Sequence, residues 1–97
     1  MFRHVVMFKW SPDAPGSARE QAVEALRRWA TQAAAYGEVT VGTDAALVEG
    51  NHHVAVVADF PDQDAYLRYA SDPAHLGLVR EHIVPLIESR AAVQHSW

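Results

Sequence analysis

Apolar and polar positions alternate along the first ten residues of the chain. One side of this alternation holds Phe2, His4, Val6, Phe8 and Trp10. A period of two is typical of a β-strand, because successive side chains point to opposite faces. Similar alternation predicts further strands over residues 38–43, 52–60 and 91–97.

Two other segments place apolar residues three or four positions apart, the spacing of an amphipathic helix. Ser17 and Glu20 form a capping-box pattern that predicts the start of the first helix, and Gly37 is a natural stop. The second segment opens at Pro61-Asp62 and restarts at Asp72-Pro73, with Asp as N-cap and Pro at the first helical position. Its apolar stripe continues as far as Leu86.

The elements therefore follow the order β-α-β-β-α-β, with the second helix broken at Asp72-Pro73. This order predicts an α+β, ferredoxin-like antiparallel sheet in which both helices cover one face. A length of 97 residues predicts a single domain, 1–97. The first and third strands are expected at the centre of the sheet.

Both faces of these two central strands are apolar. Val5 and Met7 oppose Val6 and Phe8 on the first strand, and the third strand repeats the pattern. A strand that is apolar on both sides indicates that both faces of the sheet are covered. We expect a homodimer through the sheet face, which would form a dimeric α/β barrel. The alternative is an open face that carries scattered apolar side chains.

Composition narrows the function classes. The chain has no cysteine, which excludes disulfides, thiolate metal sites and a thiol nucleophile. Its formal net charge of −4 argues against a nucleic-acid partner. No apolar run is long enough to span a membrane, and the first residues lack the pattern of a signal peptide. We expect a cytoplasmic protein with no membrane association.

Six histidines are available for chemistry. His4 and His53 are expected on strand faces that look toward the helices, His75 near the start of the last helix, and Tyr69 just before it. These four side chains are predicted to converge at one end of the space between sheet and helices. A histidine near a helix N-terminus favours its neutral form and can act as a general base. A tyrosine hydroxyl beside it can stabilise an enolate.

This set suits proton abstraction next to a carbonyl and requires neither a metal nor a redox cofactor. Two alternatives stay open at this point. The histidines could be hydrogen-bonded structural residues, or three of them could bind a metal, although no HExxH spacing is present. Phosphate-loop, GxSxG and GxGxxG motifs are also absent from the sequence. We predict no cofactor and no metal.

Four segments resemble the stress-responsive A/B barrel (Dabb) domain in order and spacing over essentially the whole chain. They are RHVVMFKW, VTVGTD, HHVAVVADF and DAYLRYASDPAHLGLV. The resemblance implies a ferredoxin-like subunit that dimerises through its sheet. The characterised member nearest in residue pattern is olivetolic acid cyclase, which closes a linear polyketide by an aldol-type condensation.

The resemblance to that cyclase implies a catalytic pair, His75 and Tyr69, and a substrate-binding pair, His4 and His53. It also implies an apolar lining, which we assign to Val23, Leu26 and Ala55. Asp72 stands where the cyclase has a histidine, and the lining is less bulky, so a different substrate is expected.

The resulting hypothesis is a dimer that binds a small hydrophobic or aromatic ligand, with cofactor-free cyclase, lyase or isomerase activity. The alternative is a non-catalytic ligand-binding or stress-protective homodimer. A relation to dimeric ferredoxin-like monooxygenases has no residue-level support in the sequence.

Overall fold

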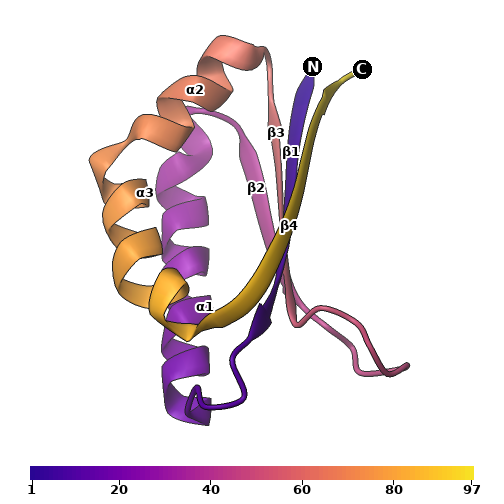
Figure 1. The fold of residues 1–97 in the computed structure, drawn as a ribbon. Coiled ribbons are helices and arrows are strands. Elements are labelled where there is room, and N and C mark those ends of the chain that lie inside the picture. Colours follow the sequence, from indigo (N-terminus) through magenta and orange to yellow (C-terminus); the bar gives the residue numbers. More distant parts are fainter.

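The computed structural model describes residues 1–97 and contains one four-stranded antiparallel sheet with its helices on one side (Figure 1). In chain order the elements are β1 (Phe2–Trp10), α1 (Gly16–Gln32), η1 (Ala33–Ala35), β2 (Glu38–Thr43), β3 (Val54–Phe60), α2 (Gln63–Ser71), α3 (Pro73–Leu78), η2 (Val79–Ile83), η3 (Val84–Leu86) and β4 (Ile87–Ser96). The strands lie in the order β2-β3-β1-β4, so β1 and β3 are central. The predicted ferredoxin-like βαββαβ fold is confirmed.

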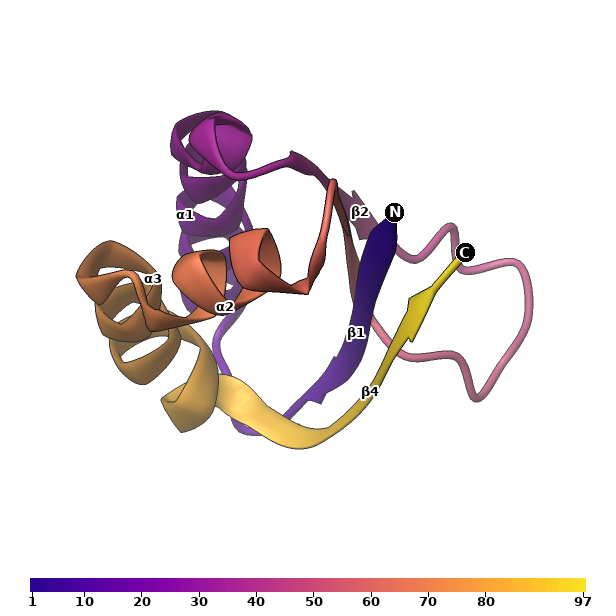
Figure 2. The same ribbon diagram turned by 90° about the horizontal axis from the view of Figure 1, so that it is seen from above.

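The register of the central strands decides which side chains face the helices. His4 lies opposite Ala58, and Phe8 lies opposite Val54, so these residues share one face of the sheet. Ala58 is fully buried, and Phe8 and Val54 are nearly so. The helices lie over this face, and the other face has no element of the chain across it (Figure 2).

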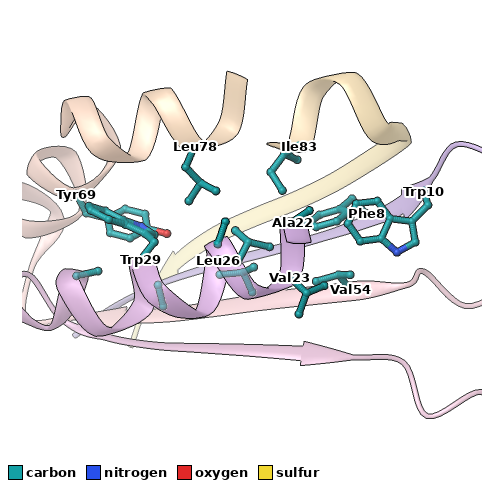
Figure 3. Packing of buried hydrophobic residues seen from close by; sticks show 14 of the residues in the cluster. Phe8, Trp10, Ala22, Val23, Leu26, Trp29, Val54, Tyr69, Leu78 and Ile83 are labelled. Carbon is teal, nitrogen blue, oxygen red and sulfur yellow. The ribbon is translucent and has the colours of Figure 1, made fainter. Parts of the chain in front are cut away.

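The core fills the layer between the sheet and α1. Ala22 of α1 is fully buried, and Leu26 and Trp29 continue its apolar stripe toward the sheet (Figure 3). Small side chains in this stripe allow the helix to approach the strands closely, and the larger ones fill the remaining space. No helix is both long enough and apolar enough to cross a bilayer.

The predicted capping box of the first helix is wrong. Pro15, in an extended conformation, occupies the N-cap position, so α1 begins at Gly16 and Ser17 is already inside its first turn. No side chain caps this helix end. Arg19 instead bonds the preceding loop, donating to the carbonyl oxygens of Ala14 (2.9 Å) and Ser11 (3.1 Å).

The last helical segment changes type along its length, and two predicted strand starts shift. The helical segment after Asp72 changes to a π-helical turn in η2 and ends in a 3₁₀ turn, η3, which contains Pro85. The last strand begins at Ile87 rather than at residue 91, because β1 continues to Trp10 and pairs with it through an irregularity after Lys9. The third strand begins at Val54, two residues later than predicted.

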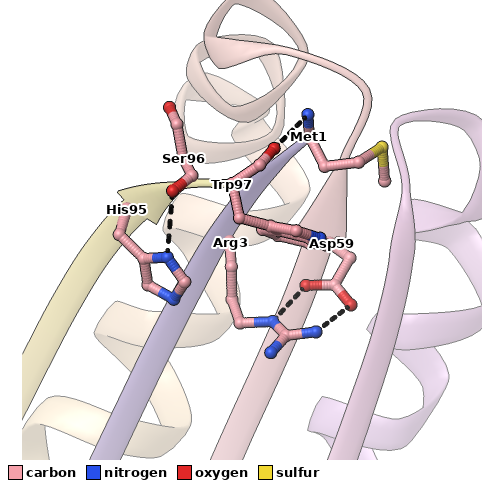
Figure 4. Close-up of polar contacts among 6 residues, drawn as sticks. All are labelled: Met1, Arg3, Asp59, His95, Ser96 and Trp97. Carbon is pink, nitrogen blue, oxygen red and sulfur yellow. Dashed lines mark hydrogen bonds and ion pairs between the residues drawn. The ribbon is translucent and has the colours of Figure 1, made fainter.

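The helix-free face of the sheet combines an apolar centre with one ion pair at the end of the two central strands. Arg3 donates two hydrogen bonds to Asp59, at 2.6 and 3.0 Å (Figure 4). The ring of Trp97 lies 4.5 Å from the Arg3 guanidinium carbon. The amide of Trp97 also donates to the Met1 carbonyl, so the two ends of the chain lie side by side.

Candidate functional site

A cavity of about 290 Å³ lies between the sheet and the segment from α2 to η3. Eight of its thirteen lining residues carry aliphatic or phenyl side chains. The remaining five carry polar groups and are His4, Tyr66, Tyr69, His75 and Arg90. An apolar pocket with a few converging polar groups is the usual form of a small-molecule site.

The break between α2 and α3 positions His75. Asp72 accepts a hydrogen bond from the Ala74 amide (2.8 Å) and caps α3, with Pro73 at the first helical position, as predicted. The ring of His75 then lies 4.8 Å from the ring of Tyr69, which stands at the end of α2. Trp29 packs against both rings, at 5.6 and 5.5 Å between centroids.

One hydrogen bond defines the tautomer of His75. Its Nδ1 lies 3.2 Å from the carbonyl oxygen of Ala70. A carbonyl oxygen can only accept, so Nδ1 carries the proton and Nε2 keeps its lone pair. Burial lowers the pKa of His75, although the Ala70 hydrogen bond and the charge of Asp72 oppose this shift. His75 is therefore a neutral imidazole with a basic nitrogen available at neutral pH.

His4 has the opposite tautomer. The amide Nε2 of Gln94 lies 3.0 Å from Nδ1 of His4 and also donates to the Tyr66 hydroxyl at 3.2 Å. An amide N–H can only donate, so Nδ1 of His4 accepts and Nε2 carries the proton. Burial lowers the pKa of His4, and the charge of Arg90 lowers it further. His4 can therefore donate a hydrogen bond from Nε2.

Tyr69 supplies a second donor. Only 3% of its surface is exposed, and its ring packs against Phe60 and His75. Burial raises the pKa of Tyr69, the nearby Trp29 indole N–H opposes this shift, and Tyr66 adds a smaller rise. The hydroxyl therefore keeps its proton at neutral pH and can donate to a carbonyl or enolate oxygen. The cavity thus contains one neutral base and two neutral donors.

The predicted convergence of His53 with this cluster is wrong. His53 lies just before β3, beside the far end of β1, where its Nδ1 accepts a hydrogen bond from the Trp10 amide (2.9 Å). It has the same strand parity as Ala55 and Asp59, which belong to the helix-free face. The charge of Asp59 was the signal in the sequence that this face of the third strand is the open one.

The structure places one of the three predicted lining residues at the cavity. Leu26 lines the cavity. Val23 is buried one turn earlier on α1 and borders a separate, more polar hollow beside Trp10 and Thr43. Ala55 pairs with Met7 on the helix-free face and does not reach the cavity.

Three residues of the site are absent from the sequence prediction. Gln94 lies directly opposite His4, and Arg90 lies opposite Phe8 on the same strand pair. The ring of Tyr66 packs against the ring of His4 at a tilt, with 5.1 Å between ring centroids. Gln94 could have been placed only with the register of the last strand. Arg90 lay outside the predicted strand altogether.

The histidines do not form a metal-binding cluster. His4 and His75 border the cavity, but His53 lies at the other end of the sheet. No group of three His, Asp or Glu side chains is arranged to hold a metal ion.

Comparison with known protein families identifies the family of this chain. Residues 2–96 match the stress responsive A/B barrel domain (Dabb). The chain belongs to this family. The match spans every element of the fold and confirms the family resemblance read from the sequence.

Solved structures agree with this assignment. A dimeric ferredoxin-like protein of unknown function from Thermobifida fusca is 31% identical to this chain, with a TM-score of 0.88 over 99% of this chain and 90% of that one. A Dabb family protein with a ferredoxin-like fold from Mesorhizobium loti is 24% identical, with a TM-score of 0.72 over 99% and 95% of the two chains.

A hydroxynitrile lyase from Passiflora edulis has the same fold. It is 18% identical to the Dabb chain, with a TM-score of 0.78 over 97% of this chain and 90% of the lyase. At this identity the likeness concerns the fold alone. No match is found among curated proteins.

Proposed function

We propose that this Dabb protein binds a small apolar or aromatic carbonyl compound between its sheet and helices and moves a proton at the carbon next to the carbonyl. The observation that carries the proposal is the neutral His75 beside the protonated Tyr69 in an apolar cavity. His75 is the general base, Tyr69 is a hydrogen-bond donor, and His4 helps to position the carbonyl oxygen. No cofactor is needed for this step.

The step follows from the tautomers of the two histidines. Nε2 of His75 takes the proton from carbon, and the C–H electron pair moves onto the carbonyl oxygen to form an enolate. Tyr69 and Nε2–H of His4 donate to this oxygen. Neutral donors in a site shielded from water stabilise a developing negative charge more strongly than water-exposed groups do.

Aldol-type ring closure is the fuller form of this proposal. The enolate carbon attacks a second carbonyl carbon of the same molecule, and a new carbon–carbon bond forms. The resulting alkoxide oxygen takes the proton back from His75, which balances the step. The resemblance of the residue pattern to that of olivetolic acid cyclase supports this reaction class. Asp72 and the aliphatic lining favour a different substrate.

The proposed assembly is a homodimer through the helix-free face of the sheet. Val5, Met7 and Val57 form an apolar centre on this face, and Val93 of β4 extends it. The protein from Thermobifida fusca, at 31% identity, is described as dimeric. Burial of this face is favourable because it removes apolar surface from water.

Proton exchange tests the reaction without knowledge of the substrate. The probe is 4-phenylbutan-2-one in D₂O, and ¹H NMR measures how fast deuterium replaces the protons next to its carbonyl. We expect the wild-type protein to accelerate exchange over buffer and His75→Ala to reduce this acceleration by about 100-fold or more, since general-base catalysis contributes about that factor. Tyr69→Phe should also lower the rate.

His52→Ala is the matched control, because His52 lies in the connection between β2 and β3, away from the cavity. It should leave the rate unchanged. An exchange rate that His75→Ala does not alter contradicts the proposal. Binding of the ketone without any exchange supports the alternative, a ligand-binding dimer that is not catalytic.

A further inference from the structure

One charged side chain borders the otherwise uncharged cavity. Arg90 is exposed at its edge, on β4 opposite Phe8, and shares the helix-facing side of the sheet with His4. No Asp or Glu lines the cavity. The Arg90 guanidinium makes no hydrogen bond or ion pair within the protein, whereas Arg3 is paired with Asp59.

The charge of Arg90 acts inside the cavity. It contributes to the lowered pKa of His4, after the larger effect of burial. Apolar walls beside a cation strengthen its attraction for an anion, because they exclude water of high dielectric constant. The chain as a whole carries a net charge of −4, so this positive spot is local and not part of a basic surface.

The position of Arg90 separates it from the acid–base groups. On β4 it lies four residues from Gln94, the partner of His4, which corresponds to about 13 Å along an antiparallel strand. The cavity surface also includes the apolar side chains of Val6 and Ile83. Arg90 and His75 both line the cavity, so a single ligand can contact both of them.

We propose that Arg90 binds a carboxylate of the ligand, so that the cavity takes a carboxylic acid with an apolar or aromatic body. A planar guanidinium matches a carboxylate with two parallel hydrogen bonds, and one such group suits a singly charged anion. The volume of about 290 Å³ is roughly twice that of a cavity that holds benzene, which leaves room for a ring and a short chain. The inference uses the cavity of the proposed function but requires no turnover.

A pair of probes that differ only in charge tests this inference. Isothermal titration calorimetry at pH 7.5 compares 4-phenylbutanoate with 4-phenylbutanamide. We expect the acid to bind about tenfold more tightly to the wild-type protein, the usual size of a hydrogen bond to a charged group. Arg90→Gln should remove this preference and leave amide binding unchanged. Arg90→Lys should keep part of it.

Arg27→Gln is the matched control, because Arg27 is exposed on α1 and does not line the cavity. It should bind both probes as the wild-type protein does. Circular dichroism melts of all variants establish that they are folded. Equal binding of acid and amide to the wild-type protein, an equal loss of both in Arg90→Gln, or binding of neither probe would overturn the inference.

The same experiment separates this inference from the proposed reaction. His75→Ala should retain the preference for the acid even though it loses proton exchange. A preference that depends on Arg90 in a protein without exchange activity supports the ligand class and contradicts the reaction. Exchange that depends on His75 without any preference for the acid contradicts only the ligand class.

Discussion

The backbone carbonyl of Ala70 and the side-chain amide of Gln94 give two neighbouring histidines different chemical roles. Both histidines are neutral, with His4 buried and His75 half-buried. The Ala70 carbonyl holds a proton on Nδ1 of His75, whereas the Gln94 amide donates to Nδ1 of His4. The free Nε2 is therefore a base on one ring and a donor on the other. A single residue type thus supplies both functions that enolate chemistry requires.

The lowered pKa values of His4 and His75 predict a specific pH dependence. A histidine with a lower pKa in the folded state binds fewer protons there than in the unfolded chain, so stability rises with pH across the interval between the two values. The free energy of unfolding should therefore fall as the pH drops below about 6.5, the usual histidine value.

Two-dimensional ¹H–¹⁵N NMR of the imidazole rings measures this directly. Both histidines should titrate with midpoints below about 6.5 in the folded protein, and close to that value in the urea-unfolded chain, which is the reference state. A folded-state midpoint at or above the unfolded value for His75 contradicts the neutral-base assignment. Urea unfolding at several pH values checks the sign of the stability change.

The sequence predicts the position of a site residue only where a local pattern determines that position. His75 follows an Asp-Pro helix start, and Tyr69 precedes it by six residues, so both could be placed without a structure. His53 could not, because one residue of strand parity moves a side chain to the opposite face. Gln94 lies ninety residues from His4 in the chain, so its position depends on strand pairing that no local pattern contains.

At the scale of elements, the fold was predictable in order but not at every boundary. The alternation of β1 and the Asp-Pro cap of α3 are local signals, and both are observed. The end of the last helix is different, since η2 and η3 leave the regular α-helical hydrogen-bond pattern before Ile87. Pairing with β1 extends β4 to this point, and that tertiary contact outweighs helical spacing.

Gly37 ends the first helical segment as the sequence predicts, but the reason for a glycine at this position differs from the usual one. A glycine after a helix usually adopts a left-handed conformation, but Gly37 has no positive φ. A Cβ at this position would instead collide with the Asp59 carbonyl oxygen and press on the Phe60 ring. The glycine is required because the chain after η1 passes directly against β3.

Substitution of two glycines tests this reason. Gly37→Ala should lower the free energy of unfolding by about 1–3 kcal/mol, the range for overpacking, because the backbone of Asp59 cannot move aside easily. Gly77→Ala is the matched control: nothing lies within 4 Å of its Cβ position in α3. It should raise stability by up to about 1 kcal/mol through helix propensity. Urea unfolding measures both, and equal effects would contradict the close-approach argument.

At the scale of the whole molecule, one face of the sheet is covered by the helices and the other is exposed (Figure 2). The helix-facing side holds the core and the cavity, whereas the other side leaves Met7 and Val93 at 39% and 57% exposure. The ion pair of Arg3 and Asp59 stands beside this apolar area, where a charged border can fix the register of a partner. These features favour a second copy of the chain as the partner that buries the helix-free face.

Light scattering after size-exclusion chromatography tests the proposed dimer. The wild-type protein should have twice the 10.7-kDa mass of the chain. Val5→Glu should give a monomer, because Val5 lies on a central strand of the helix-free face and two copies would bury facing carboxylates. Leu67→Glu is the matched control, an equal change at a site 58% exposed on α2, on the helix side of the sheet. It should leave the mass unchanged. A wild-type monomer at micromolar concentration, or a dimer that survives Val5→Glu, would show that the apolar face is not the dimer interface.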